Sequence, residues 1–79
     1  MDRMTATGRL QDVFRAVFND DDIEISETMT AADYEAWDSL NHIKLIMDTE
    51  KAFDIRFLNA EIARLENVGD LLTLVCEKS

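Results

Sequence analysis

The chain has no proline, two glycines, one cysteine and one histidine among its 79 residues. Because proline is missing and the only glycines are Gly8 and Gly69, nothing marks an internal domain boundary. We therefore expect one small domain over residues 1–79 with a modest hydrophobic core. A lone cysteine cannot form an internal disulfide, and neither a charged-then-apolar leader nor an apolar run of membrane length occurs. These absences favour a monomeric, cytoplasmic protein without membrane insertion.

Positive charge is also scarce. The chain has 17 acidic and 8 basic side chains, which gives a formal net charge of −9. The acids are concentrated between Asn19 and Asp38, where no lysine or arginine occurs. Such a protein repels nucleic-acid phosphates and anionic lipid, and attracts basic protein surfaces. The sequence predicts protein partners with positive patches and no nucleic-acid binding.

The spacing of the apolar residues predicts an all-α fold, a small four-helix bundle of three longer helices and one short helix. The first helix is expected from about Ala6 to Phe18. Its buried stripe would consist of Leu10, Val13, Phe14, Val17 and Phe18. A long, ordered acidic loop should follow, because the apolar residues from Ile23 to Trp37 are too irregular for a helix. Within it, Ala31 to Glu35 could form a short turn.

A second helix should begin at Ser39 with Asp38 as its N-cap, since that carboxylate can accept hydrogen bonds from the first-turn amides. From Leu40 to Phe53 the helix would carry two apolar stripes on roughly opposite sides. The first stripe contains Leu45, Ile46 and Phe53, with His42 and Thr49 between them. The second contains Leu40, Ile43 and Met47, flanked by Lys44, Lys51 and Asp54. Only one can face the core, so the second is either covered by the loop or a docking surface.

The last third of the chain predicts a link and two further helices. Phe53, Ile55 and Phe57 alternate, which indicates an extended link that could pair with Ile23 and Ile25 as a two-stranded ribbon. Asn59 can cap a short helix through about Arg64 that buries Ile62 and Leu65. Asn67 can cap a last helix with one apolar face, formed by Val68, Leu71, Leu72 and Val75.

The residues that could do chemistry have simpler structural interpretations. His42 lies among apolar positions, so we expect a half-buried, hydrogen-bonded imidazole rather than a metal ligand. The segment Asn19 to Glu24 lacks the glycine and the alternating ligands of a calcium loop. Cys76 should pack as a small hydrophobe. One histidine and one cysteine supply no nucleophile, base and orienting group together, so we predict neither a catalytic nor a metal site.

Around Asp38-Ser39-Leu40 the chain resembles the acyl carrier proteins, and the resemblance covers nearly its whole length. Ser39 matches the serine of the Asp-Ser-Leu signature, which in that family begins the second helix and receives a 4'-phosphopantetheine arm from coenzyme A. Aliphatic, acidic and aromatic family positions are matched by Leu45, Ile46, Met47, Glu50 and Phe53. The resemblance implies a non-catalytic carrier that holds acyl intermediates as thioesters. Its partners would be a phosphopantetheinyl transferase and acyl-processing enzymes with basic docking patches.

The resemblance also implies a docking surface on the second helix. Its residues would be Leu40, Asn41, Ile43, Lys44, Met47, Asp48, Glu50 and Asp54. Asn41 and Lys44 occupy positions that are acidic in many carriers of the housekeeping fatty acid pathway, and Trp37 replaces a residue that is often small. We therefore interpret the chain as a specialised stand-alone member. The alternative is an unmodified acidic helical adaptor, which binds a basic partner through the second helix and in which Ser39 is an ordinary helix-start residue.

Overall fold

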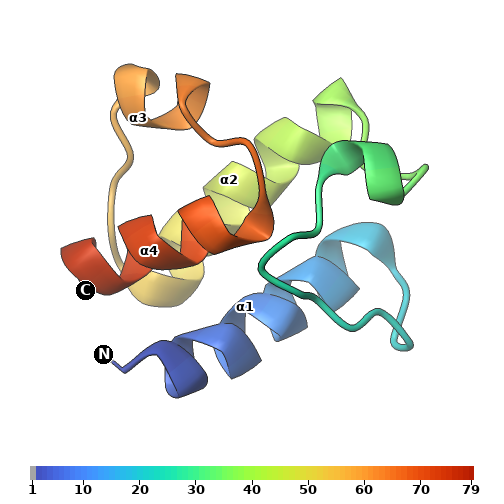
Figure 1. The fold of residues 1–79 in the computed structure, drawn as a ribbon, viewed down its shortest axis with the longest axis horizontal. Helices are drawn as coiled ribbons and strands as arrows, with labels where there is room; N and C mark the ends of the chain where they lie inside the picture. The colour runs from blue at the N-terminus through green and yellow to red at the C-terminus, as the bar shows by residue number, and fades with distance from the viewer. Residues whose placement is uncertain (1) are drawn as a thin grey trace.

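The computed structural model describes residues 2–79, and all of its regular elements are helical (Figure 1). In chain order they are α1 (Arg3–Phe18), the 3₁₀ helix η1 (Ala31–Asp33), α2 (Ser39–Phe53), α3 (Asn59–Ala63) and α4 (Val68–Lys78). This confirms the predicted all-α bundle of three longer helices and one short one. In Figure 1 both chain ends lie on the left, whereas the light-green first turn of α2 lies on the opposite side.

Helix α1 begins at Arg3, three residues before the predicted start at Ala6. Asp2 explains the difference, because its carboxylate accepts the Thr5 N–H at 2.8 Å and the Thr5 hydroxyl at 3.0 Å. These hydrogen bonds also hold the pKa of the Asp2 carboxyl below its usual value. The helix ends where predicted, with Asn19 in the left-handed conformation as its C-cap.

The core lies where α1 packs against α2 and α4. The predicted stripes supply most of it: Leu10, Val13, Phe14 and Val17 from α1, Leu45, Ile46, Thr49 and Phe53 from α2, and Val68, Leu71, Leu72 and Val75 from α4 are all buried. The one buried polar side chain among the described residues is Thr49, and its hydroxyl donates to the Leu45 carbonyl at 2.7 Å. Cys76 is half-buried against this core, as predicted.

The segment between α1 and α2 is the ordered loop that the sequence predicts. Ile23 and Trp37 are buried near its two ends. The Tyr34 hydroxyl donates to the Asp20 carboxylate at 2.8 Å, and this hydrogen bond raises the pKa of the Tyr34 phenol. The two ends of the loop are thereby joined across 14 positions of sequence.

The middle of the loop is fixed to the start of α4. The N–H groups of Val68 and Gly69 each donate at 2.9 Å to loop carbonyls, those of Met29 and Glu27 respectively. These amides are in the first turn of α4 and have no partner inside the helix, so the loop satisfies donors that would otherwise need water. Arg3 of α1 adds an ion pair with the Glu27 carboxylate.

The predicted two-stranded ribbon is wrong, because residues 2–79 contain no strand. The backbone groups that would have formed it bond elsewhere. The Ile25 N–H donates to the Gln11 side chain at 3.1 Å, and the Phe57 N–H donates to the Glu50 carboxylate at 2.8 Å. Ile23, Ile55 and Phe57 are still buried, so their apolar character reports burial rather than pairing.

The prediction that Asn59 caps the short helix is also wrong by one position. Asn59 is the first residue of α3, and Leu58 is the N-cap. A leucine side chain cannot accept a hydrogen bond, so the Glu61 carboxylate caps instead by accepting the Leu58 N–H at 2.8 Å. That bond and, second, the side chain of Lys78 lower the pKa of Glu61. Asn67 caps α4 as predicted and accepts the Asp70 N–H at 2.8 Å.

Candidate functional site

The first turn of α2 is held by the residues that precede it. Asp38 is the N-cap, as predicted, and its carboxylate accepts the Asn41 N–H at 2.9 Å. The Asn41 side chain in turn donates to the Ala36 carbonyl at 2.8 Å. The backbone on both sides of Ser39 is therefore fixed by hydrogen bonds, which gives an attachment point on this turn a defined position.

Trp37 anchors the same segment to the core. Its indole is 8% exposed and packs edge-to-face on Phe14, with ring centroids 5.3 Å apart. The indole N–H donates to Nδ1 of His42 at 3.0 Å. Because the indole nitrogen can only donate, Nδ1 of His42 is the acceptor of this hydrogen bond. The half-buried, hydrogen-bonded imidazole that the sequence predicts is confirmed.

Ser39 differs from the other two serines of the chain. All three, Ser26, Ser39 and Ser79, are exposed. Ser79 donates to the Val75 carbonyl at 2.7 Å, and the Ser26 hydroxyl lies 3.5 Å from the hydroxyl of Thr28. Within residues 2–79 the Ser39 hydroxyl has no hydrogen-bond partner. It is therefore the serine whose oxygen is both accessible and uncommitted.

The electrostatics of this turn favour a negative group. Within the described part of the chain, the N–H groups of Ser39 and Leu40 have no acceptor. Free amides and the helix macrodipole together attract an anion to a helix N-terminus. The Asp38 carboxylate, which caps the turn, offsets part of this attraction because it has the same sign as the anion.

An open hollow of about 620 Å³ lies beside Ser39. Its walls are mostly apolar and consist of Ala31, Trp37, Asp38, Ser39, His42 and Ile43. A smaller hollow of about 70 Å³ shares Ala31, Trp37 and His42 with it and reaches Leu65 and Leu71. The predicted site included Asp38, Ser39 and Leu40 but missed Ala31, which the loop brings to this end of α2. Its contribution could not be read from the spacing of residues within α2.

The second apolar stripe of α2 is uncovered. Leu40, Ile43 and Met47 are 76%, 59% and 53% exposed. Of the two outcomes that the sequence left open, the loop does not cover the stripe. Single exposed apolar residues are ordinary, but three on one helix face form a patch of the kind that often binds other proteins.

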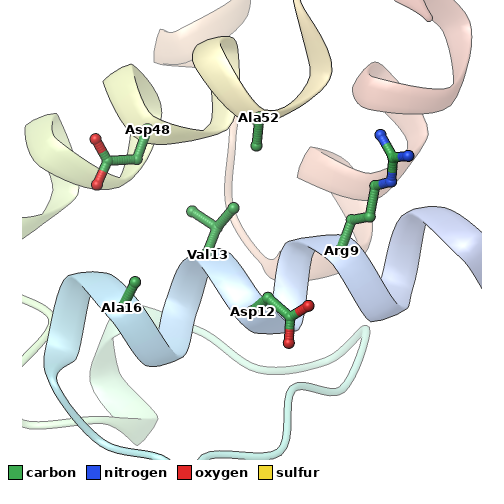
Figure 2. A pocket seen from close by; sticks show the side chains of 6 residues that line it. All are labelled: Arg9, Asp12, Val13, Ala16, Asp48 and Ala52. Carbon is green, nitrogen blue, oxygen red and sulfur yellow. The ribbon is translucent and has the colours of Figure 1, made fainter.

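The polar residues of the predicted docking surface fall into different surroundings. Lys44 and Asp54 are exposed, whereas Asn41 and Glu50 are half-buried and bonded as described above. Asp48 is half-buried on the flank that faces α1. There it lines a hollow of about 350 Å³, shown in Figure 2, where Val13 extends from α1 toward α2. Asp48 therefore lies on a different side of α2 from the stripe.

Two cations that the predicted docking surface did not include stand beside the stripe. Lys51 and Arg56 are exposed and line a hollow of about 260 Å³ together with Met47, Glu50, Asp54 and Ile55. The sequence analysis placed Lys51 beside the stripe, together with Lys44 seven residues earlier, but did not count it among the docking residues. Arg56 lies beyond the helix, where helical periodicity gives no information.

Within residues 2–79, no group of three or more histidine, cysteine, aspartate or glutamate side chains is arranged to hold a metal ion. No helix in the same part of the chain has the combined length and apolar character needed to cross a membrane.

Comparison with known proteins identifies similarity to a solved structure. No protein-family model matches the chain, and no curated protein matches it. Among solved structures, it is similar to the solution NMR structure of a holo acyl carrier protein from Geobacter metallireducens, with a TM-score of 0.89 and 43% sequence identity. The match covers 95% of this chain and 86% of the other.

Proposed function

The chain belongs to the acyl carrier protein family, and from this membership we propose that it carries acyl groups on a 4'-phosphopantetheine arm joined to the hydroxyl of Ser39. The observation that supports this site best is the contrast among the three serines, since Ser39 alone combines exposure, an uncommitted hydroxyl and a place on the first turn of a helix. The chain itself would be non-catalytic.

The residues around Ser39 fit such an arm. A phosphodiester on this side chain would lie near the free N–H groups of Ser39 and Leu40, which can donate to its oxygens. The apolar walls formed by Trp37 and Ile43 would accommodate aliphatic parts of the arm and cargo. Once attached, the arm supplies a terminal thiol that holds the acyl group as a thioester.

Attachment requires Ser39 to act as a nucleophile toward coenzyme A. The Ser39 oxygen forms a bond to the phosphorus at the pantetheine end, the bond from that phosphorus to the rest of the nucleotide breaks, and adenosine bisphosphate leaves. The hydroxyl proton passes to a base of the transferase. His42 is not available as that base through Nδ1, because this nitrogen accepts the Trp37 hydrogen bond. Base and metal would therefore come from the transferase.

The uncovered stripe of Leu40, Ile43 and Met47 is proposed to dock the transferase and the acyl-processing enzymes. It starts one residue after Ser39 and continues along α2 for two turns. A partner seated on the stripe would therefore have its active site close to the arm.

Intact-mass spectrometry tests the attachment site. Incubation with coenzyme A and a broad-specificity phosphopantetheinyl transferase should add the mass of one arm to the wild type and to Ser26→Ala, but not to Ser39→Ala. Ser26→Ala is the matched control because it removes another exposed serine. A folded wild-type protein that never takes up the arm would favour the unmodified acidic adaptor.

A further inference from the structure

We infer that the partners of this carrier present an acidic surface to the side of the stripe marked by Lys44 and Lys51, with a carboxylate seated between Lys51 and Arg56. The inference rests on the proposed carrier function and names the chemistry of the partner. It runs against the net charge of −9, which by itself would favour a basic partner.

The first argument is the position of the cations. Lys44 and Lys51 are both exposed and are seven residues apart, which places them on the same side of α2 about 10 Å apart along its axis. Arg56 shares a hollow with Lys51 and with Met47 of the apolar stripe. A carboxylate in this hollow would meet two cations and sit next to the apolar contact.

The second argument is that these cations have no internal partners. The ion pairs within residues 2–79 are Arg3 with Glu27 and Lys78 with Glu61. No carboxylate of the described residues lies within ion-pairing distance of Lys44, Lys51 or Arg56. Their charges are therefore available to a second protein.

Two of the three acids nearest to this surface, Asp48 and Glu50, are less available than its cations. Glu50 lines the same hollow, but its carboxylate already accepts the Phe57 N–H at 2.8 Å. Asp48 lies on the flank that faces α1. Asp54 is exposed at the end of the helix and lines the same hollow as Glu50, where it offsets part of the positive charge of Lys51 and Arg56. The stripe therefore has a cationic side and a weakly anionic end.

Screening decides which charges a docked partner senses. At physiological salt the Debye length is about 8 Å, so surface charges farther away contribute little. Eight of the acids belong to the segment Asn19–Asp38, whereas positions 39–58 contain three acids and three bases. Apart from the Asp38 cap, the docking helix and its link are thus neutral in sum, so a docked partner senses their individual charges more than the net charge of −9.

The test uses a phosphopantetheinyl transferase whose carrier-docking surface is basic, with arm transfer followed by intact mass. The double variant Lys44→Glu/Lys51→Glu should be modified roughly fivefold faster in kcat/KM than the wild type, because rim charges set encounter rates. The matched control Arg9→Glu/Arg64→Glu has the same net charge and alters cations outside the stripe, so it should change the rate much less. The difference in kcat/KM between the wild type and Lys44→Glu/Lys51→Glu should vanish near 1 M salt, where the Debye length is about 3 Å.

A transferase variant with its docking arginines changed to glutamate should reverse the order and prefer the wild type over Lys44→Glu/Lys51→Glu. Equal rates for wild type and double variant, or an equal gain in the control, would overturn the inference. Both outcomes would leave the carrier function standing, since the arm is still attached. If neither the wild type nor the variants accept the arm at excess transferase, the proposed function itself fails.

Discussion

The two glycines allow one substitution to be made twice with opposite expected effects on stability. Gly69 is the second residue of α4, and its N–H donates to the Glu27 carbonyl at 2.9 Å. A Cβ at position 69 would lie 2.9 Å from that same carbonyl oxygen and 3.2 Å from the cap atom Oδ1 of Asn67. Gly8 lies on the exposed face of α1, and a Cβ there would meet nothing within 4 Å.

The magnitudes follow from these surroundings. Gly8→Ala should raise the free energy of unfolding by about 0.5–1 kcal/mol, because alanine loses less backbone entropy in a helix. Gly69→Ala has the same intrinsic gain but must displace a backbone carbonyl and a helix cap. Losing that hydrogen bond costs about 1 kcal/mol, and weakening the Asn67 cap costs up to about 1 kcal/mol more. A net loss of about 1 kcal/mol is expected.

Urea denaturation followed by far-ultraviolet circular dichroism measures both effects. The two variants should differ by about 2 kcal/mol, or by roughly 8–16 °C in Tm for a domain of this size. Neither glycine has a positive φ, so the difference between the two variants reflects the space available for the added methyl group rather than backbone strain. If Gly69→Ala were as stable as Gly8→Ala, the loop would not be held against α4 by the contact described above.

Three further outcomes are expected. Asp38→Ala should lower the free energy of unfolding by about 1 kcal/mol through loss of the α2 cap, and an unchanged urea midpoint would show that the cap contributes nothing. Trp37→Phe removes the indole N–H and should show a coupling of about 1 kcal/mol with His42→Ala in a double-mutant cycle, whereas a value near zero would mean that the hydrogen bond adds no stability. The lowered pKa values of Asp2 and Glu61 mean that the unfolded chain binds these protons at higher pH than the folded chain does. The two ionised carboxylates add their full stabilisation above their usual pKa values of 3.8 and 4.5. This stabilisation is lost as the pH falls from those values through the lowered pKa values of the folded protein. Asp2→Asn should therefore unfold with a weaker acid dependence than the wild type, and identical pH profiles would contradict this.

Helical periodicity predicted the parts of the fold that depend only on residues within or directly next to one helix. The buried faces of α1, α2 and α4 and the Asp38 and Asn67 caps follow from spacing and residue type alone. The exposure of Leu40, Ile43 and Met47 was one of two outcomes that spacing allowed. Choosing between them required the path of the loop, which long-range contacts determine.

The errors have a common physical origin. Ile23, Ile25, Ile55 and Phe57 have the alternation of strands, yet the loop and link bond to Gln11 and Glu50 side chains. Side-chain acceptors far away in sequence competed with backbone pairing, and no local pattern reports them. At Leu58 the error was smaller, because Glu61 caps α3 from inside the helix and a polar residue at the N-cap was not needed.

The arrangement of the chain ends has a practical consequence for measuring partner affinity. Both ends lie on one side of the molecule, and the leading turn of α2 lies on the other (Figure 1). A biotin tag at either end would hold the carrier on a sensor with the leading turn of α2 facing the flowing solution. Immobilised wild type and charge-reversed variants could then be compared without the anchor obstructing the approaching enzyme.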